Sequence, residues 1–340
     1  AGVEAEDLAV GVGGPTFTAR KLTRTERLLR QREIGILCAA VVIFVALSLL
    51  RPETFPTESN LLNIARQISF IAIIAVGMTF LFIAGELDLS VGSLVGLCVA
   101  VLMFLMARWE WNPWVAMLAT IGLGAVGGLV NGLITTRFGI PSFIVTLGTL
   151  STFRGLALLV SGGWPLTIES SNWTAATGGY ILGDKVPIPV LWMAAIMLIG
   201  GFVLAKTKFG YHVYATGGNK QAAVVAGINV NRVKLVCFVL TGALCGLSAS
   251  LLVAWLKQGN PLAGINWELD VIAAVIIGGT NLFGGSGSIF GTFLGAAING
   301  MVINGLVHLG LTQFWDQVAR GVIIVAAVLL DLFIRRRQER

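Results

Sequence analysis

Charge is scarce in this sequence: Asp, Glu, Lys and Arg make up only 12% of the 340 residues. Soluble domains carry roughly a quarter charged residues, and disordered chains combine high charge with low hydrophobicity, so both classes are excluded. Only two histidines are present, which argues against a histidine-ligated metal site, and we predict neither a metal site nor a catalytic residue. The four cysteines lie inside apolar runs without a C-x-x-C pair, which is typical of packing residues.

Apolar residues and glycine are abundant, with 56% hydrophobic residues, 43 glycines and a mean hydropathy of +0.87. A transmembrane helix needs about 20 apolar residues, so we predict an all-α, polytopic membrane bundle of about ten transmembrane helices. The predicted spans are residues 34–50, 67–84, 91–107, 113–136, 142–161, 189–205, 233–255, 269–283, 289–309 and 318–334. The run 269–283 is short and contains Gly278 and Gly279, which predicts a broken or re-entrant helix.

Basic residues collect in three segments, which we predict to be cytoplasmic because Lys and Arg favour that side of a membrane. These are an N-terminal segment (1–33), a loop (206–232) and a C-terminal tail (335–340). They enclose a single transmembrane domain over 34–334 whose longest external loop is 162–188. The net charge of +6 then reflects orientation, and we expect no nucleic-acid partner. A cleaved signal peptide is the alternative for the first run, but the long polar lead favours an uncleaved span.

The loop 206–232 contains a short predicted helix over 219–226, with Gly217 and Gly218 before it and Gly227 after it. A short cytoplasmic helix between two spans suits the docking of a soluble partner. Residues 122–127 match the dinucleotide motif G-x-G-x-x-G, but they lie inside an apolar span and indicate close helix packing instead. No complete phosphate-binding loop is present, so we expect the chain to bind no cofactor and to hydrolyse no nucleotide itself.

Three features of the spans leave alternatives open. Glu86 and Asp88 either mark a helix break beside a conduit or form a tight turn in which Ser90 caps the next helix. Arg154 either reaches the outer interface or points into the bundle toward substrate. A weak similarity between residues 77–96 and 278–291 indicates an internal repeat of the kind found in transporters, or chance in a glycine-rich chain.

Four motifs in the chain resemble the permease subunits of bacterial ribose-type sugar ABC transporters, whose members handle ribose, xylose, arabinose, rhamnose, galactofuranose and autoinducer-2. They are GELDLSVGSLVGL (85–97), RFGIPSFIVTLGTL (137–150), TKFGYHVYATGGNKQAAVVAGI (207–228) and GGTNLFGGSGSIFGTFLGA (278–296). The resemblance runs in order over about 34–334 and excludes the first 33 residues. Because several long motifs match together, it is specific.

The resemblance implies a non-enzymatic permease in the bacterial inner membrane that imports a monosaccharide. It implies a dimer with a second copy or a sister permease, a cytoplasmic ATPase with two cassettes that uses ATP and Mg²⁺, an external sugar-binding protein and surrounding lipid. It also places the ATPase-coupling helix on Gly218, Asn219, Lys220, Gln221, Ala222, Ala223 and Gly227. Relatives commonly have glycine where Glu86 stands, which leaves the role of that position open.

A sugar conduit should be lined by small and polar side chains. The candidates for the pathway or gate are Glu86, Asp88, Ser90, Ser93, Asn131, Thr146, Thr149, Arg154, Asn281, Asn299 and Asn304. One alternative function is a branched-chain amino-acid ABC permease, which shares ancestry but fits the four motifs less well. A second is an ion-coupled secondary transporter, which would need ionisable residues at mid-membrane, and a membrane-embedded enzyme has little support.

Overall fold

The computed structural model describes residues 32–329, apart from 170, 184, 313, 323–324 and 327–328. The predicted basic tail, residues 1–31 of the predicted N-terminal segment and part of the last predicted span lie outside the described residues. The described chain is helical, with two pairs of very short strands. It is therefore the polytopic helical membrane protein that its composition predicts.

The first half of the chain supplies five long helices. They are α2 (Arg32–Leu50), α3 (Glu58–Ile83), α4 (Val91–Ala107), α5 (Pro113–Phe138) and α6 (Ser142–Ser161). Polar caps fix two of their starts: Thr57 accepts a hydrogen bond from the Asn60 amide at α3, and Asn112 accepts one from the Trp114 amide at α5. Gly139, at φ 68°, ends α5 in the left-handed conformation that glycine adopts without strain.

The second half follows a small folded connection. The connection contains β1 (Leu166–Thr167), α7 (Asn172–Gly178), β2 (Tyr180–Ile181) and β3 (Val186–Pro187). Helices α8 (Ile188–Lys206), α9 (Lys208–Gly218), α10 (Lys220–Val225) and α11 (Val230–Leu256) come next, then β4 (Gln258–Gly259), α12 (Trp267–Ile277), α13 (Ile289–His308) and helical residues at 314–322. Strand β1 pairs antiparallel with β4, and β2 with β3, so two predicted external segments meet at one end of the bundle.

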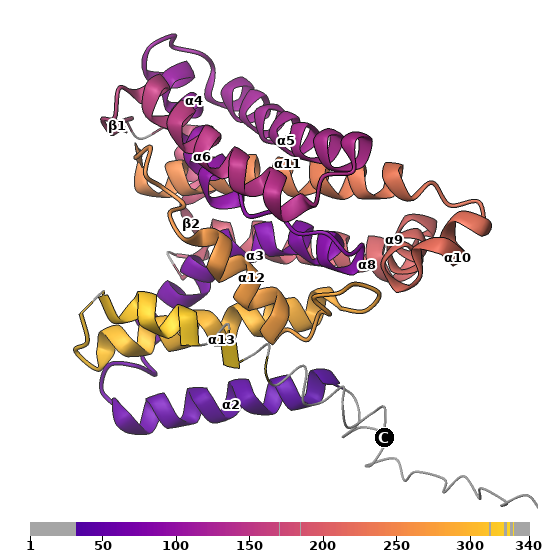
Figure 1. Cartoon of the computed structure of the whole chain (residues 1–340). Helices are drawn as coiled ribbons and strands as arrows, with labels where there is room; N and C mark the ends of the chain where they lie inside the picture. The colour runs from indigo at the N-terminus through magenta and orange to yellow at the C-terminus, as the bar shows by residue number, and fades with distance from the viewer. Residues whose placement is uncertain are drawn as a thin grey trace, which may run out of the picture.

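Helices α3 and α11 form the centre of the bundle, since most of their residues are buried, whereas α2 lies at its edge beside α13 (Figure 1). Helix α5 runs along α11, and glycines bring the two backbones together. Gly124 lies against Gly242, and Gly128 lies against the Phe238 carbonyl. Two glycines of the G-x-G-x-x-G motif thus serve helix packing, as the sequence predicts: Gly124 against α11 and Gly127 against Leu94 of α4.

Seven helices of the described chain are long and apolar enough to cross a membrane, and α4 is a shorter apolar helix of 17 residues. The structure thus supports a polytopic bundle without fixing the predicted number of ten spans. Helix α12 has 11 residues, and at 1.5 Å per residue it covers only about half of a hydrocarbon core. This agrees with the broken helix predicted over 269–283.

Both halves contain an interrupted helix with the same local sequence. Helix α3 is followed by a break at 84–90 and then α4, and α11 is followed by a break at 257–266 and then α12. Glu-Leu-Asp occurs at 86–88 and again at 268–270. Gly92 at the start of α4 touches Gly264 and Glu268, so the two breaks meet inside the bundle. The similarity between residues 77–96 and 278–291 stays a prediction: at each segment a helix ends, a glycine-containing break follows and the next helix begins, α3 to α4 and α12 to α13.

Candidate functional site

Helices α9 and α10 project from one end of the bundle (Figure 1). Asn219 separates them: its amide donates to the Ala215 carbonyl at the end of α9, and its side chain accepts from the Ala222 amide at the start of α10. The short helix predicted over 219–226 is thus confirmed as α10 with Asn219 as its N-cap. The preceding helix α9 is not predicted from the sequence.

Most of the predicted docking residues lie on the open surface of this projection. The exposed ones are Gly218, Asn219, Lys220, Gln221, Ala222 and Gly227. Ala223 is only 3% exposed, so its methyl group holds α10 in place and is closed to a partner. Sequence reasoning missed Val224 and Val225, which are 57% and 90% exposed. Two adjacent valines in the most polar loop of the second half are the signal that could have identified them.

The base of α9 contacts the end of α3, where the first break begins, and the loop 278–288 between α12 and α13. The Tyr214 hydroxyl donates to the Gly287 carbonyl at 2.7 Å, just before α13. Burial and the nearby Glu33 carboxylate raise the pKa of Tyr214, which keeps this hydroxyl protonated as a donor. Gly217 packs against the Ile83 carbonyl, the last of α3. A movement of α9 would therefore reach the end of α3 and the loop 278–288 at once.

Three predicted pathway residues form a closed cluster at the first break. Asp88 is fully buried and accepts hydrogen bonds from the Ser90 amide at 2.8 Å and the Ser90 hydroxyl at 2.6 Å. Asn131 of α5 donates to Asp88 at 3.1 Å and to Ser90 at 2.9 Å. The Ser90 hydroxyl thus serves Asp88 and does not cap α4. The cluster fixes the break against α5, as buried carboxylates require.

Glu86 and Arg154 tie the breaks to other helices. Glu86 forms an ion pair with Lys234 of α11, and both side chains are mostly buried. Arg154 of α6 points into the bundle and donates to the carbonyls of Pro261 at 2.7 Å and Ala263 at 3.0 Å. This settles its direction in favour of the bundle interior, although its partners are backbone carbonyls of the second break.

Most of the remaining pathway candidates form hydrogen bonds with other groups of the protein. Some are bonded within their own element: Thr146 to the Ser142 carbonyl, Thr149 to the Thr146 carbonyl, and Asn281 to the Phe283 amide in the loop after α12. Asn304 exchanges two hydrogen bonds of 3.0 Å with Asn60, beside His308. Ser93 is 3% exposed in α4. Their predicted role in a pathway remains a prediction.

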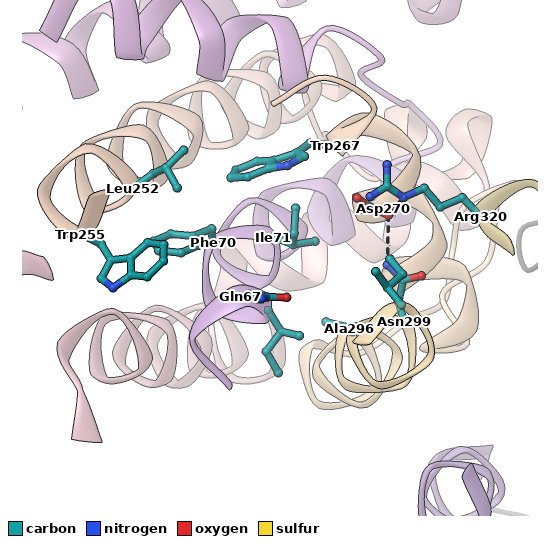
Figure 2. Close-up of a pocket in the computed structure, with 13 residues that line it drawn as sticks. Gln67, Phe70, Ile71, Leu252, Trp255, Trp267, Asp270, Ala296, Asn299 and Arg320 are labelled. Carbon is teal, nitrogen blue, oxygen red and sulfur yellow. Dashed lines mark hydrogen bonds and ion pairs between the residues drawn. The ribbon is translucent and has the colours of Figure 1, made fainter. Parts of the chain in front are cut away.

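Asn299 differs because it borders a cavity. Its amide nitrogen donates to Asp270 at 3.2 Å, and Arg320 lies 3.0 Å from the same carboxylate oxygen. Figure 2 shows these three side chains on one wall of a cavity of about 230 Å³, with Phe70, Trp255 and Trp267 among its other lining residues. Asp270 and Arg320 are absent from the predicted site, although the repeated Glu-Leu-Asp could have drawn attention to Asp270.

No group of three or more His, Cys, Asp or Glu side chains within the described residues is placed to hold a metal ion. The arrangement instead combines a projecting docking segment, two helix breaks that meet inside the bundle, and a polar cavity beside the second break. A projecting segment that contacts the ends of membrane helices can transmit movement to them, and a polar cavity can accommodate a polar solute.

Comparison with known proteins gives a consistent set of relatives. The family described as "Branched-chain amino acid transport system / permease component" matches residues 60–328. The chain is 41% identical to the probable ABC transporter permease protein YphD of Escherichia coli K12 over 91% of this chain and 92% of that protein. It is 39% identical to the ribose import permease protein RbsC of Bacillus subtilis over 88% and 92%, and 36% identical to the L-arabinose ABC transporter permease protein AraH of Azospirillum brasilense over 90% and 89%. No solved structure matches the chain.

Proposed function

Because the chain belongs to the family of branched-chain amino acid transport system permease components, we propose that it is the membrane permease of an ABC importer for a monosaccharide. The observation that carries the proposal is its similarity, over nine-tenths of its length, to permeases named for ribose and L-arabinose. As a member of that family, the chain is a multi-pass transport protein of the bacterial inner membrane and not an enzyme.

The family description names branched-chain amino acids, which keeps that substrate class as the second candidate. Three observations favour sugars: the relatives named for ribose, for xylose and for L-arabinose each match most of this chain. A specific substrate within the sugars is not part of the proposal. In a binding-protein-dependent importer, the external binding protein supplies much of the selectivity.

We place the ATPase on the surface of α10, where Lys220, Gln221 and Ala222 lie beside the exposed Val225. A hollow of about 460 Å³ adjoins it, lined in part by Gly227 and Asn229. In this proposal ATP and Mg²⁺ act in the partner ATPase, an external binding protein delivers the sugar at the opposite end, and a second permease completes the pathway. Both chain termini then face the cytoplasm.

The proposed orientation is supported by which loops lie together. Segments expected in the cytoplasm converge at one end, where the Gly285 amide bonds the Ile83 carbonyl at 2.9 Å and α9 packs on both. Segments expected outside converge at the other end, where β1 pairs with β4. Nucleotide-driven movement of α10 would pass through α9 to the end of α3, where the first break begins, and to the loop 278–288 before α13.

The test is uptake into proteoliposomes that contain the permease, its ATPase and its binding protein. Labelled D-ribose, D-xylose, L-arabinose and L-leucine are compared at equal concentration with ATP inside. We expect at least one sugar to accumulate and leucine to remain at background. Accumulation of leucine with no uptake of any sugar would transfer the chain to the second candidate class.

A further inference from the structure

The cavity beside the second break has the composition of a sugar-binding site, and we infer that it holds the transported monosaccharide during passage through this permease. The inference rests on the proposed function and deepens it by naming a site. It concerns the cavity of about 230 Å³ between α3, α11, α12, α13 and helical residues 314–322 (Figure 2). That volume lies below the roughly 300–1,000 Å³ of pockets for drug-sized ligands, as suits a smaller solute.

One wall of the cavity is aromatic. The rings of Phe70 and Trp267 are stacked, with centroids 6.5 Å apart and an interplanar angle of 18°. Trp255 lies on the other side of Phe70 at 6.4 Å. A sugar ring carries C–H groups on its faces and hydroxyls on its edge, so a flat aromatic wall can cover the apolar face. Rigid aromatic rings provide such contact area at little cost in side-chain entropy.

The facing wall is polar and already oriented. A carboxylate only accepts hydrogen bonds, so the Asn299 side chain must turn its amide nitrogen to Asp270. This leaves the Asn299 carbonyl oxygen without a hydrogen-bond partner, and Asn299 as a residue is only 4% exposed. An unsatisfied buried acceptor is unfavourable. A sugar hydroxyl in the cavity would remove that penalty after a rotation of the Asn299 side chain, because the oxygen itself is covered by protein atoms in this structure. Gln67 adds a further amide to the lining.

The polar wall carries one negative group, Asp270, and one positive group, Arg320, which pair with each other. This pairing favours an uncharged ligand. Arg320 lies 3.0 Å from Asp270, so neither group is free to act as a lone counter-ion for a charged solute. Asp270 also lies in the first turn of α12, where the positive end of the helix dipole favours a carboxylate. A neutral ligand with several hydroxyls can bond all these groups without separating the pair. An amino acid would have to divide the pair between its ammonium and its carboxylate.

A second buried acid–asparagine pair gives a contrast. Asp88 accepts a hydrogen bond from Asn131 and two more from the amide and hydroxyl of Ser90. Asp270 likewise accepts a hydrogen bond from Asn299, but this pair borders the cavity. The pair at α12 therefore has space beside it for a solute.

The test uses the permease in lipid nanodiscs and saturation-transfer NMR with D-ribose, D-xylose, L-arabinose and L-leucine at millimolar concentration. The variants are Asn299→Leu, which keeps the volume and removes the amide, and Trp267→Ala, which removes the aromatic wall. Trp114→Phe is the control, because Trp114 is exposed on α5 and is not a lining residue of the cavity. We expect a signal from the transported sugar that falls about tenfold in both cavity variants, because loss of a buried polar partner or of an aromatic contact weakens binding by about that factor. The signal should persist in the control.

Transport by the same variants completes the test. In proteoliposomes with the ATPase and binding protein, Asn299→Leu should lower sugar uptake about tenfold while ATPase docking stays at the wild-type level. Its melting temperature should fall modestly, because the buried Asp270 loses one hydrogen bond. Uptake and NMR signal of Asn299→Leu and Trp267→Ala equal to wild type would overturn the cavity assignment and leave the proposed function intact. Failure of the wild-type complex to take up any sugar would instead refute the proposed function. A signal from leucine alone would overturn both.

Discussion

The contact between α9 and the end of α3 gives the sharpest prediction about how movement is transmitted. Gly217 has no side chain, and a methyl group added there would lie 2.8 Å from the Gly285 amide nitrogen and closer still to the Ile83 carbonyl oxygen. Backbone lies on both sides, so neither neighbour can yield as a flexible side chain would. Gly217→Ala must therefore separate α9 from α3 or break the Gly285–Ile83 hydrogen bond.

The expected cost follows from these two effects. Overpacking a tight contact costs about 1–3 kcal/mol, and loss of one backbone hydrogen bond adds about 0.5–1.5 kcal/mol. Alanine recovers up to about 1 kcal/mol through its higher helix propensity. The net destabilisation is about 0.5–4.5 kcal/mol, concentrated where α9 meets the end of α3 and the loop 278–288. We expect a lower melting temperature and fewer sugar molecules transported per ATP hydrolysed.

Gly122→Ala is the matched control, because the same methyl group on α5 would meet nothing within 4 Å. It should keep the wild-type melting temperature and the wild-type ratio of sugar to ATP. Both quantities are measured on purified complexes, by thermal unfolding in detergent and by paired uptake and phosphate-release assays. If Gly217→Ala behaves like Gly122→Ala in both assays, the contact of α9 with Ile83 does not transmit the movement.

Three further predictions follow from the docking surface, the ion pair and the topology. Val225→Glu places a charge on the most exposed apolar side chain of α10, and should abolish co-purification of the ATPase at an unchanged melting temperature; retained co-purification would refute the docking assignment. Glu86→Gln should destabilise the protein more than the double variant Glu86→Gln, Lys234→Met, because the single change leaves a mostly buried charge unpaired; additive effects in thermal unfolding would contradict this. In a background without cysteine, Leu182→Cys should react with an impermeant maleimide from outside and Gln221→Cys only from the cytoplasm; reversed access would overturn the orientation.

The architecture could be predicted from the sequence wherever a long apolar run or a helix-capping residue was present. Long apolar runs define the spans because a membrane helix must satisfy its backbone internally. Asn219 between a glycine pair and an alanine-rich stretch marks α10 through ordinary capping chemistry. Helix α9 was missed because its residues, Lys208–Gly218, include three glycines and show no long apolar run, and its contacts with α3 and the loop 278–288 stabilise it.

The site was less predictable because burial decides what a polar side chain does. Thr146 and Thr149 are candidates by residue type, yet both bond carbonyls of their own helix. Asp270 could not be separated from an interfacial anchor by position in the sequence. Its depth depends on α12 starting inside the bundle after the break at 257–266, which is a tertiary feature. The only hint in the sequence was that Glu-Leu-Asp occurs at 86–88 and again at 268–270. The structure shows that these two stretches lie close together, since Gly92 touches Gly264 and Glu268.

The most direct measurement of the account is nucleotide dependence of sugar uptake in proteoliposomes of defined composition. The account predicts that labelled sugar accumulates only when permease, ATPase and binding protein are all present with ATP on the side of α10, and that accumulation stops with Val225→Glu. Accumulation by the permease alone, driven by an ion gradient without any nucleotide-hydrolysing protein, would contradict it.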